Sequence, residues 1–151
     1  MGTTFDEIID LAKISFNDYK LDQLYNISID DFTTYMSGFV VKSIPKFYDC
    51  KQNLESVNLM TNTFPFELTL TEKVILSDFT VIEWMTSKIL DITQMNLHLN
   101  DTDFRHYSEA QNLTAKTNVQ NILIERVNQN ATSYGIKNIP WSDWANGNFG
   151  I

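Results

Sequence analysis

The sequence predicts an all-α protein: a small bundle of about four helices with a long central loop and an extended aromatic C-terminal tail. Apolar residues recur at helical spacing over four segments, and capping residues precede each of them, the last being Asn100 to Asp103. The last residues carry two tryptophans without a helical period. A chain of 151 residues, 43% of them hydrophobic, can bury one core. We expect a helical domain at residues 1 to 134 and a C-terminal arm at residues 135 to 151.

The first helix is expected to begin at Thr4. Thr4 and Glu7 have the spacing of a capping box, in which each side chain accepts a hydrogen bond from the backbone amide of the other residue. The residues at helical spacing after this start are Phe5, Ile8, Ile9, Ala12 and Phe16. The polar segment at residues 17 to 26 is expected to end the helix.

The second helix is predicted from Ser28 to about residue 50, with two aspartates in its first turn. Gly38 should weaken it by up to about 1 kcal/mol relative to alanine. Pro45 should kink or restart it, because proline lacks the amide hydrogen that an inner helical turn needs. Residues 46 to 51 would then form an angled extension.

Residues 53 to 66 have no clean apolar period and read as a long ordered loop. Two interpretations remain open: a partner binds this loop, or the loop only covers the core. The segment from residue 66 to 70 alternates polar and apolar residues, as a short strand would.

The third helix opens with a second capping box, Thr69 and Glu72, and is predicted over residues 70 to 96. It is apolar over most of its circumference, which is typical of a helix at the centre of a bundle or in a subunit interface. The fourth helix is predicted over residues 103 to 132. Within the bundle, Phe79, Ile82 and Phe104 are expected to be buried.

Charge argues against nucleic acid as a binding partner. The chain has 11 lysines and arginines against 19 aspartates and glutamates, a net charge of -8, whereas each phosphate contact needs a cation. No apolar run reaches the length of about 20 residues that a membrane span needs, and acidic residues stand near the N-terminus where a signal peptide would carry bases. We therefore expect no membrane partner and synthesis in a cytoplasm.

Residues with catalytic or metal-binding chemistry form no convincing site. The best metal candidates are His98, Asp101, Asp103 and His106, but their spacing matches no familiar site. Cys50 has no neighbouring cysteine or histidine that would make it a ligand or a nucleophile. Glu83 is best explained as an ion-pair partner of Lys88 or as an interface residue. We expect no enzyme activity, no catalytic residue, no metal and no cofactor.

The tail carries the sharper signal. Trp141 and Trp144 lie three residues apart in a segment too short to bury them against itself. They either fold back on their own domain or dock on a neighbour, since indoles are enriched at interface hot spots. The residues expected at protein interfaces are Trp84, Trp141, Trp144 and Phe149.

One part of the chain resembles a known family. A Glu-Trp pair on an apolar helix at residues 83 and 84 is followed by Leu-Asn-Asp-Thr-Asp-Phe at 99 to 104 and Tyr-Ser-Glu-Ala-Gln-Asn-Leu at 107 to 113. This pattern, within residues 70 to 134, resembles the head-tail connector or neck proteins of tailed bacteriophages of Gram-positive bacteria.

The resemblance implies a virion structural protein with a connector-like helical domain, assembled in the host cytoplasm as a homo-oligomeric ring. Its partners would be the portal and the tail or neck proteins of the same virion, and DNA would pass through the ring without being specifically bound. The alternative is a cytoplasmic helical module for protein interaction or regulation, without catalytic activity. Such a module would be monomeric or dimeric.

Overall fold

The computed structural model describes residues 2 to 15, 19 to 98 and 105 to 147, and side chains within these ranges except at 19 to 21, 92, 94 to 98 and 105 to 110. The described residues form six α-helices and two 3-10 turns, with two isolated β-bridges and no strand. The predicted all-α class is confirmed. Phe16, Phe104 and Phe149 lie outside the described residues or side chains.

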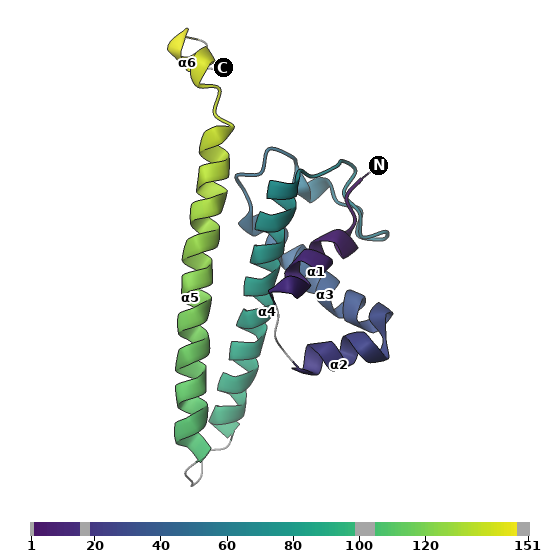
Figure 1. The fold of residues 1–151 in the computed structure, drawn as a ribbon, viewed down its shortest axis with the longest axis vertical. Helices are drawn as coiled ribbons and strands as arrows, with labels where there is room; N and C mark the ends of the chain where they lie inside the picture. The colour runs from purple at the N-terminus through teal and green to yellow at the C-terminus, as the bar shows by residue number, and fades with distance from the viewer. Residues whose placement is uncertain (1, 16–18, 99–104, 148–151) are drawn as a thin grey trace.

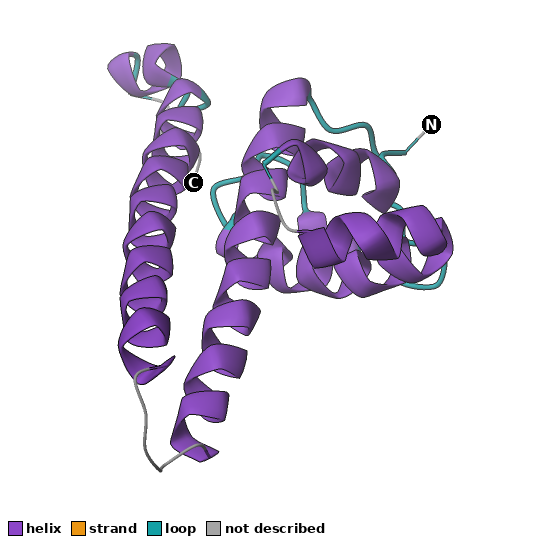
Figure 2. Cartoon of the chain, turned by 60° about the horizontal axis from the view of Figure 1, so that its bottom comes forward, coloured by secondary structure: helices purple, strands orange, loops and turns teal. Residues whose placement is uncertain are grey.

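Helix α4 (Leu70–His98) lies at the centre of the fold (Figure 1). Helix α5 (Arg105–Lys137) runs antiparallel along one side of it, while α1 (Phe5–Ile14) and α3 (Ile29–Ser43) pack on the other. A second view shows the same order, with the far halves of α4 and α5 extending past α1 and α3 as a two-helix hairpin (Figure 2). The core lies mainly where α1, α3 and α4 meet.

The capping box predicted at Thr4 is present, because the Thr4 amide donates to Glu7 Oε1 at 3.1 Å. As predicted, α1 buries Phe5, Ile8, Ile9 and Ala12. The prediction that residues 17 to 26 only end this helix is wrong, since α2 (Tyr19–Ile27) occupies most of that segment. Tertiary contacts stabilise this polar helix: the Tyr25 and Phe32 rings pack edge to face, and Lys13 Nζ lies over the Tyr25 ring.

Helix α3 begins where predicted, with the Ser28 hydroxyl accepting from the Asp31 amide at 3.2 Å. Its regular part ends at Ser43, and Pro45 lies in the 3-10 turn η1 (Ile44–Lys46). The predicted helical extension over residues 46 to 51 is wrong: after Lys46 the chain is loop and turn. Proline cannot supply the amide that would continue the α-helix, so its geometry tightens and then stops.

The loop before α4 packs onto the core at both ends. Leu54, in the 3-10 turn η2 (Leu54–Ser56), and Phe64 are buried, whereas Met60 at the turn between them is 97% exposed. The strand suggested at residues 66 to 70 is absent: Leu70 already begins α4. Instead, the Thr3 amide donates to the Phe66 carbonyl at 2.9 Å, so this segment holds the chain start to the loop.

The second capping box is complete: Glu72 Oε2 accepts from the Thr69 amide at 2.7 Å, and the Glu72 amide donates to Thr69 Oγ1 at 3.3 Å. Phe79 and Ile82 are buried in α4, as predicted. Helix α5 extends to Lys137, five residues past the predicted end, so the boundary at 134/135 lies inside it. The tail also contains α6 (Trp141–Ala145), where no helix was predicted. Pro140 directly precedes it, in a position where proline is tolerated.

Candidate assembly surfaces

The two tail tryptophans are displayed together outside the core. Their rings meet edge to face with centroids 5.6 Å apart, and Trp141 and Trp144 remain 55% and 45% exposed. Neither belongs to the hydrophobic core formed by the described residues. Helix α6 lies beyond the end of α5, away from α1 to α3 (Figure 1). The arrangement presents two large indoles to whatever lies beside the molecule.

A short connection holds this pair at the end of α5. The Trp141 indole Nε1 donates to the Ile136 carbonyl at 3.2 Å, and the Asn138 side chain donates to the Tyr134 carbonyl at 3.0 Å. Both acceptors are carbonyls of the last turns of α5, which otherwise lack partners within the helix. The direction of the tryptophan pair therefore depends on how firmly the end of α5 is held.

Helix α5 has an inner stripe that faces α4. Successive residues of this stripe are four and three positions apart in turn, the spacing of a coiled-coil seam, and none of them is exposed. The inner stripe consists of Leu113, Thr117, Gln120, Ile124, Val127, Ala131 and Tyr134. It is partly polar in the hairpin, where Gln120 donates from its amide to Thr86 Oγ1 at 2.5 Å.

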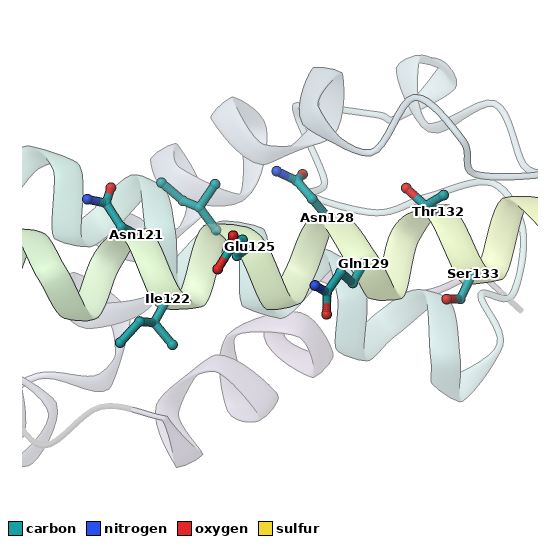
Figure 3. A pocket seen from close by; sticks show the side chains of 8 residues that line it. Asn121, Ile122, Glu125, Asn128, Gln129, Thr132 and Ser133 are labelled. Atoms are coloured by element: carbon teal, nitrogen blue, oxygen red, sulfur yellow. The ribbon is translucent and has the colours of Figure 1, made fainter.

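A second stripe with the same spacing lies on the opposite side of α5. Each of its members follows a member of the inner stripe by two positions, which is a rotation of about 200° around the helix. All its members are exposed. This outer stripe consists of Ala115, Val119, Ile122, Arg126, Gln129, Ser133 and Ile136. Figure 3 shows Ile122, Gln129 and Ser133 along one edge of a shallow hollow on α5, and Asn121, Asn128 and Thr132 along the other. Of the eight residues that line the hollow, only Glu125 is charged.

The end of α5 is fastened to the body by Tyr134. Its hydroxyl donates to Glu72 Oε1 and accepts from the Lys51 amide at 3.2 Å, while its ring lies edge-on to Phe47 with centroids 5.4 Å apart. Glu72 is 3% exposed and also accepts from Cys50 Sγ at 3.9 Å. One buried carboxylate thus joins α4, the loop after η1 and α5.

Two groups of this cluster have raised pKa values. Burial raises the pKa of Cys50 to about 11, and burial together with the bond to Glu72 raises the pKa of Tyr134 to about 12. Both groups are neutral near pH 7, so Cys50 is not a thiolate nucleophile there. The cluster is a hydrogen-bonded anchor for α5.

Of the other two residues expected at interfaces, the structure describes only Trp84. Trp84 is half-buried and packs against the hydrophobic core from α4. Phe149 lies outside the described residues. Glu83 Oε1 lies 3.8 Å from Lys46 Nζ, so its ion-pair partner is on η1 rather than Lys88 on its own helix.

Of the four candidate metal ligands, only the two histidines lie in described helices. His98 is the last residue of α4 and His106 lies in α5, while Asp101 and Asp103 lie outside the described residues. Among the described residues, no three His, Cys, Asp or Glu side chains gather as a metal site would require. None of the described helices is both long and apolar enough to cross a membrane.

Sequence reasoning overlooked the outer stripe of α5 and the bond between Glu72 and Tyr134. The stripe has a readable signal, because its apolar members Val119, Ile122 and Ile136 keep heptad spacing. The bond has none, since 62 residues separate its partners. No protein-family model matches this chain, and no curated protein or solved structure matches it either.

Proposed function

We propose that this protein is a structural subunit of a virion, a ring-forming component of the neck that joins the portal to the tail of a tailed bacteriophage. The observation that carries the proposal is the Trp141 and Trp144 pair, which is held on a short helix outside the core with about half of each residue exposed. The phage role rests on the resemblance of residues 70 to 134.

An exposed tryptophan pair favours a docking function. Each indole offers a large apolar surface with one donor nitrogen, and tryptophan is among the commonest hot-spot residues of protein interfaces. The hydrogen bond from Trp141 to Ile136 fixes the pair in one direction before binding, which lowers the entropy cost of association. We assign residues 138 to 147 as an arm that inserts into the adjacent ring or subunit.

The length of α5 and its one-sided packing also support assembly with other subunits. Helix α5 is 33 residues long, yet only α4 packs extensively on it among the described elements. A helix covered on one side leaves the other for a neighbouring subunit. The net charge of -8 suits a subunit around a DNA passage, because an acidic surface repels the phosphates that move through it.

The proposal is tested on purified particles of a phage or prophage that encodes this sequence. Quantitative mass spectrometry should find the protein in the particle at a fixed copy number, in an integer ratio to the portal subunit. Tailless heads should accumulate when the gene is deleted. A protein found only in the soluble fraction of infected cells, with normal particles formed without it, would favour the cytoplasmic interaction module.

A further inference from the structure

The last described turn of the chain contains an asparagine followed by a glycine. Of the fifteen asparagines in the sequence, only Asn146 has glycine as its next residue. In such a pair the backbone nitrogen after the asparagine can attack the side-chain amide carbon, because glycine has no Cβ to obstruct the approach. The pair therefore has the chemistry that spontaneous deamidation requires.

The structure leaves this pair open to solvent. Asn146 and Gly147 are both exposed. Gly147 has a φ of +81°, in the left-handed region, and a Cβ added to it would meet nothing within 4 Å. No side-chain hydrogen bond joins Asn146 to another described residue. Its amide group is therefore free to turn toward the nitrogen of Gly147.

Other asparagines of the described chain are held more firmly. The Oδ1 atoms of Asn53 and Asn58 accept from backbone amides two residues further on, at 3.2 and 3.0 Å. The Asn138 side chain donates to the Tyr134 carbonyl at 3.0 Å. Five more lie inside α5, where the amide that follows each of them belongs to the hydrogen-bond ladder of the helix. These five are Asn112, Asn118, Asn121, Asn128 and Asn130.

One hydrogen bond opposes the reaction at Asn146. The Gly147 amide donates to the Trp144 carbonyl at 3.1 Å, which closes the end of α6. Helix α6 has five residues, far fewer than the roughly 12 to 15 that an isolated helix needs to be stable. No residue of α6 is buried, so tertiary packing does not hold its last turn. That turn therefore opens readily and releases the Gly147 nitrogen.

We propose that Asn146 is a modification site, at which the chain deamidates spontaneously and the uncharged end of α6 becomes acidic. Hydroxide removes the proton from the Gly147 nitrogen, which attacks Asn146 Cγ and forms a new bond between nitrogen and carbon. The side-chain nitrogen of Asn146 leaves as ammonia, and the product is a succinimide ring. Water then opens the ring at either carbonyl, which gives aspartate or isoaspartate with an added negative charge.

Both products weaken the helix that carries the tryptophan pair. The new carboxylate lies at the carboxyl end of α6, where the helix dipole disfavours negative charge, and three residues after Asp143. In isoaspartate the main chain also runs through Cβ, which displaces the Gly147 amide from the Trp144 carbonyl. The inference is independent of the proposed function, because the reaction needs only the chain and water.

The test incubates the full chain at about pH 7 and about pH 9 in water enriched in heavy oxygen, followed by tryptic digestion and sequencing of the peptides by mass spectrometry. Asn146 should deamidate before the other asparagines and take up heavy oxygen from the water. The reaction should be faster at the higher pH, because hydroxide removes the proton of the Gly147 amide.

Two variants provide the controls. Gly147→Ala keeps Asn146 but places a methyl group beside the attacking nitrogen, and should slow the loss of ammonia by about tenfold or more. Asn146→Asp is the reference for the aspartate product. On anion exchange, aged wild-type protein should contain a form that elutes with this variant and a second form that an isoaspartate-specific methyltransferase labels.

Three results would overturn the inference. In the first, Asn146 stays intact at both pH values; in the second, another asparagine deamidates faster than Asn146. In the third, the wild type and Gly147→Ala lose ammonia at the same rate, which would mean that the Gly147 nitrogen is not the attacking atom. None of them decides the proposed function, which depends on whether the protein is present in particles.

Discussion

Tyr134, in the last turns of α5, donates its hydroxyl hydrogen to the buried carboxylate of Glu72 in the first turn of α4. The same carboxylate group caps α4 through the Thr69 amide. The start of one long helix and the end of the other therefore share one acceptor. Because the tryptophan arm follows directly after α5, this bond also determines where the arm stands.

Replacing Tyr134 with phenylalanine should lower the free energy of unfolding by about 1 to 3 kcal/mol, because the buried Glu72 loses a donor while the ring contact with Phe47 is kept. Urea denaturation of the variant and the wild type measures the difference. Tyr48→Phe is the control, since Tyr48 is 83% exposed. An equal loss in both variants would mean that the hydroxyl of Tyr134 contributes nothing specific.

The same tyrosine should make stability fall in alkali. Its pKa is raised from 10.0 to about 12 in the folded protein, so the folded state holds the proton more tightly than the unfolded state. The stabilisation is complete below pH 10 and is lost as the pH rises through 12. Cys50, with a pKa raised from 9.0 to about 11, acts in the same direction from pH 9. Urea midpoints between pH 8 and 12 should therefore fall less in Tyr134→Phe and in Cys50→Ala than in the wild type.

A second prediction on pH concerns Lys73 of α4, which lies 2.6 Å from Glu7 of α1 and 2.7 Å from Glu67 of the loop. The hydrogen bond from Lys73 is the main cause that lowers the pKa of Glu7. This stabilisation is present above the unfolded pKa, about 4.5, and is lost as the pH falls through the folded value. Lys73→Met should flatten the loss of stability below pH 5. Because the glutamates are partly exposed, 1 M salt should reduce the difference between the variant and the wild type.

Phe79→Ala should lower the free energy of unfolding by about 3 to 5 kcal/mol, because Phe79 is 6% exposed and packs beside Phe47 in the core. The same denaturation experiment checks it. Tyr48→Ala, which removes an aromatic ring of similar size from the surface, should change stability by less than about 0.5 kcal/mol. A loss below about 1 kcal/mol for Phe79→Ala would mean that the core relaxes around the lost ring.

The features that could be predicted from sequence depend on neighbouring residues. The capping boxes at Thr4 and Thr69 lie within three residues of their partners, so the starts of α1 and α4 were predicted where they occur. Helix α2 depends on Tyr25 meeting Phe32 and Lys13 from other helices, and such contacts cannot be read from a polar segment. Pro45 indicated a break correctly, but not that the helix would end there.

The end of α5 shows the same limit. Gly135 is normally a sign that a helix stops, yet α5 continues to Lys137. Tyr134 is held by Glu72, and a Cβ on Gly135 would lie only 3.3 Å from Asp49 Cβ. Glycine is therefore explained by the close approach of the loop to the helix. That reason requires the fold to be known first.

The last prediction concerns the arm. Truncation after Ile139 keeps α5 whole and removes Trp141 and Trp144, whose rings contact each other rather than the core of the described residues. The truncated chain should melt within about 2 to 4 °C of the full chain, because a change in stability below about 1 kcal/mol shifts the melting temperature of a domain of this size by no more than that. Its incorporation into particles should fall sharply, since an interface that loses two hot-spot residues weakens by several kcal/mol. The double substitution of both tryptophans by alanine, in the full-length chain, separates loss of the indoles from loss of the segment. If truncation lowers the melting temperature by tens of degrees, the tryptophans belong to the core of their own chain and the arm has no docking role.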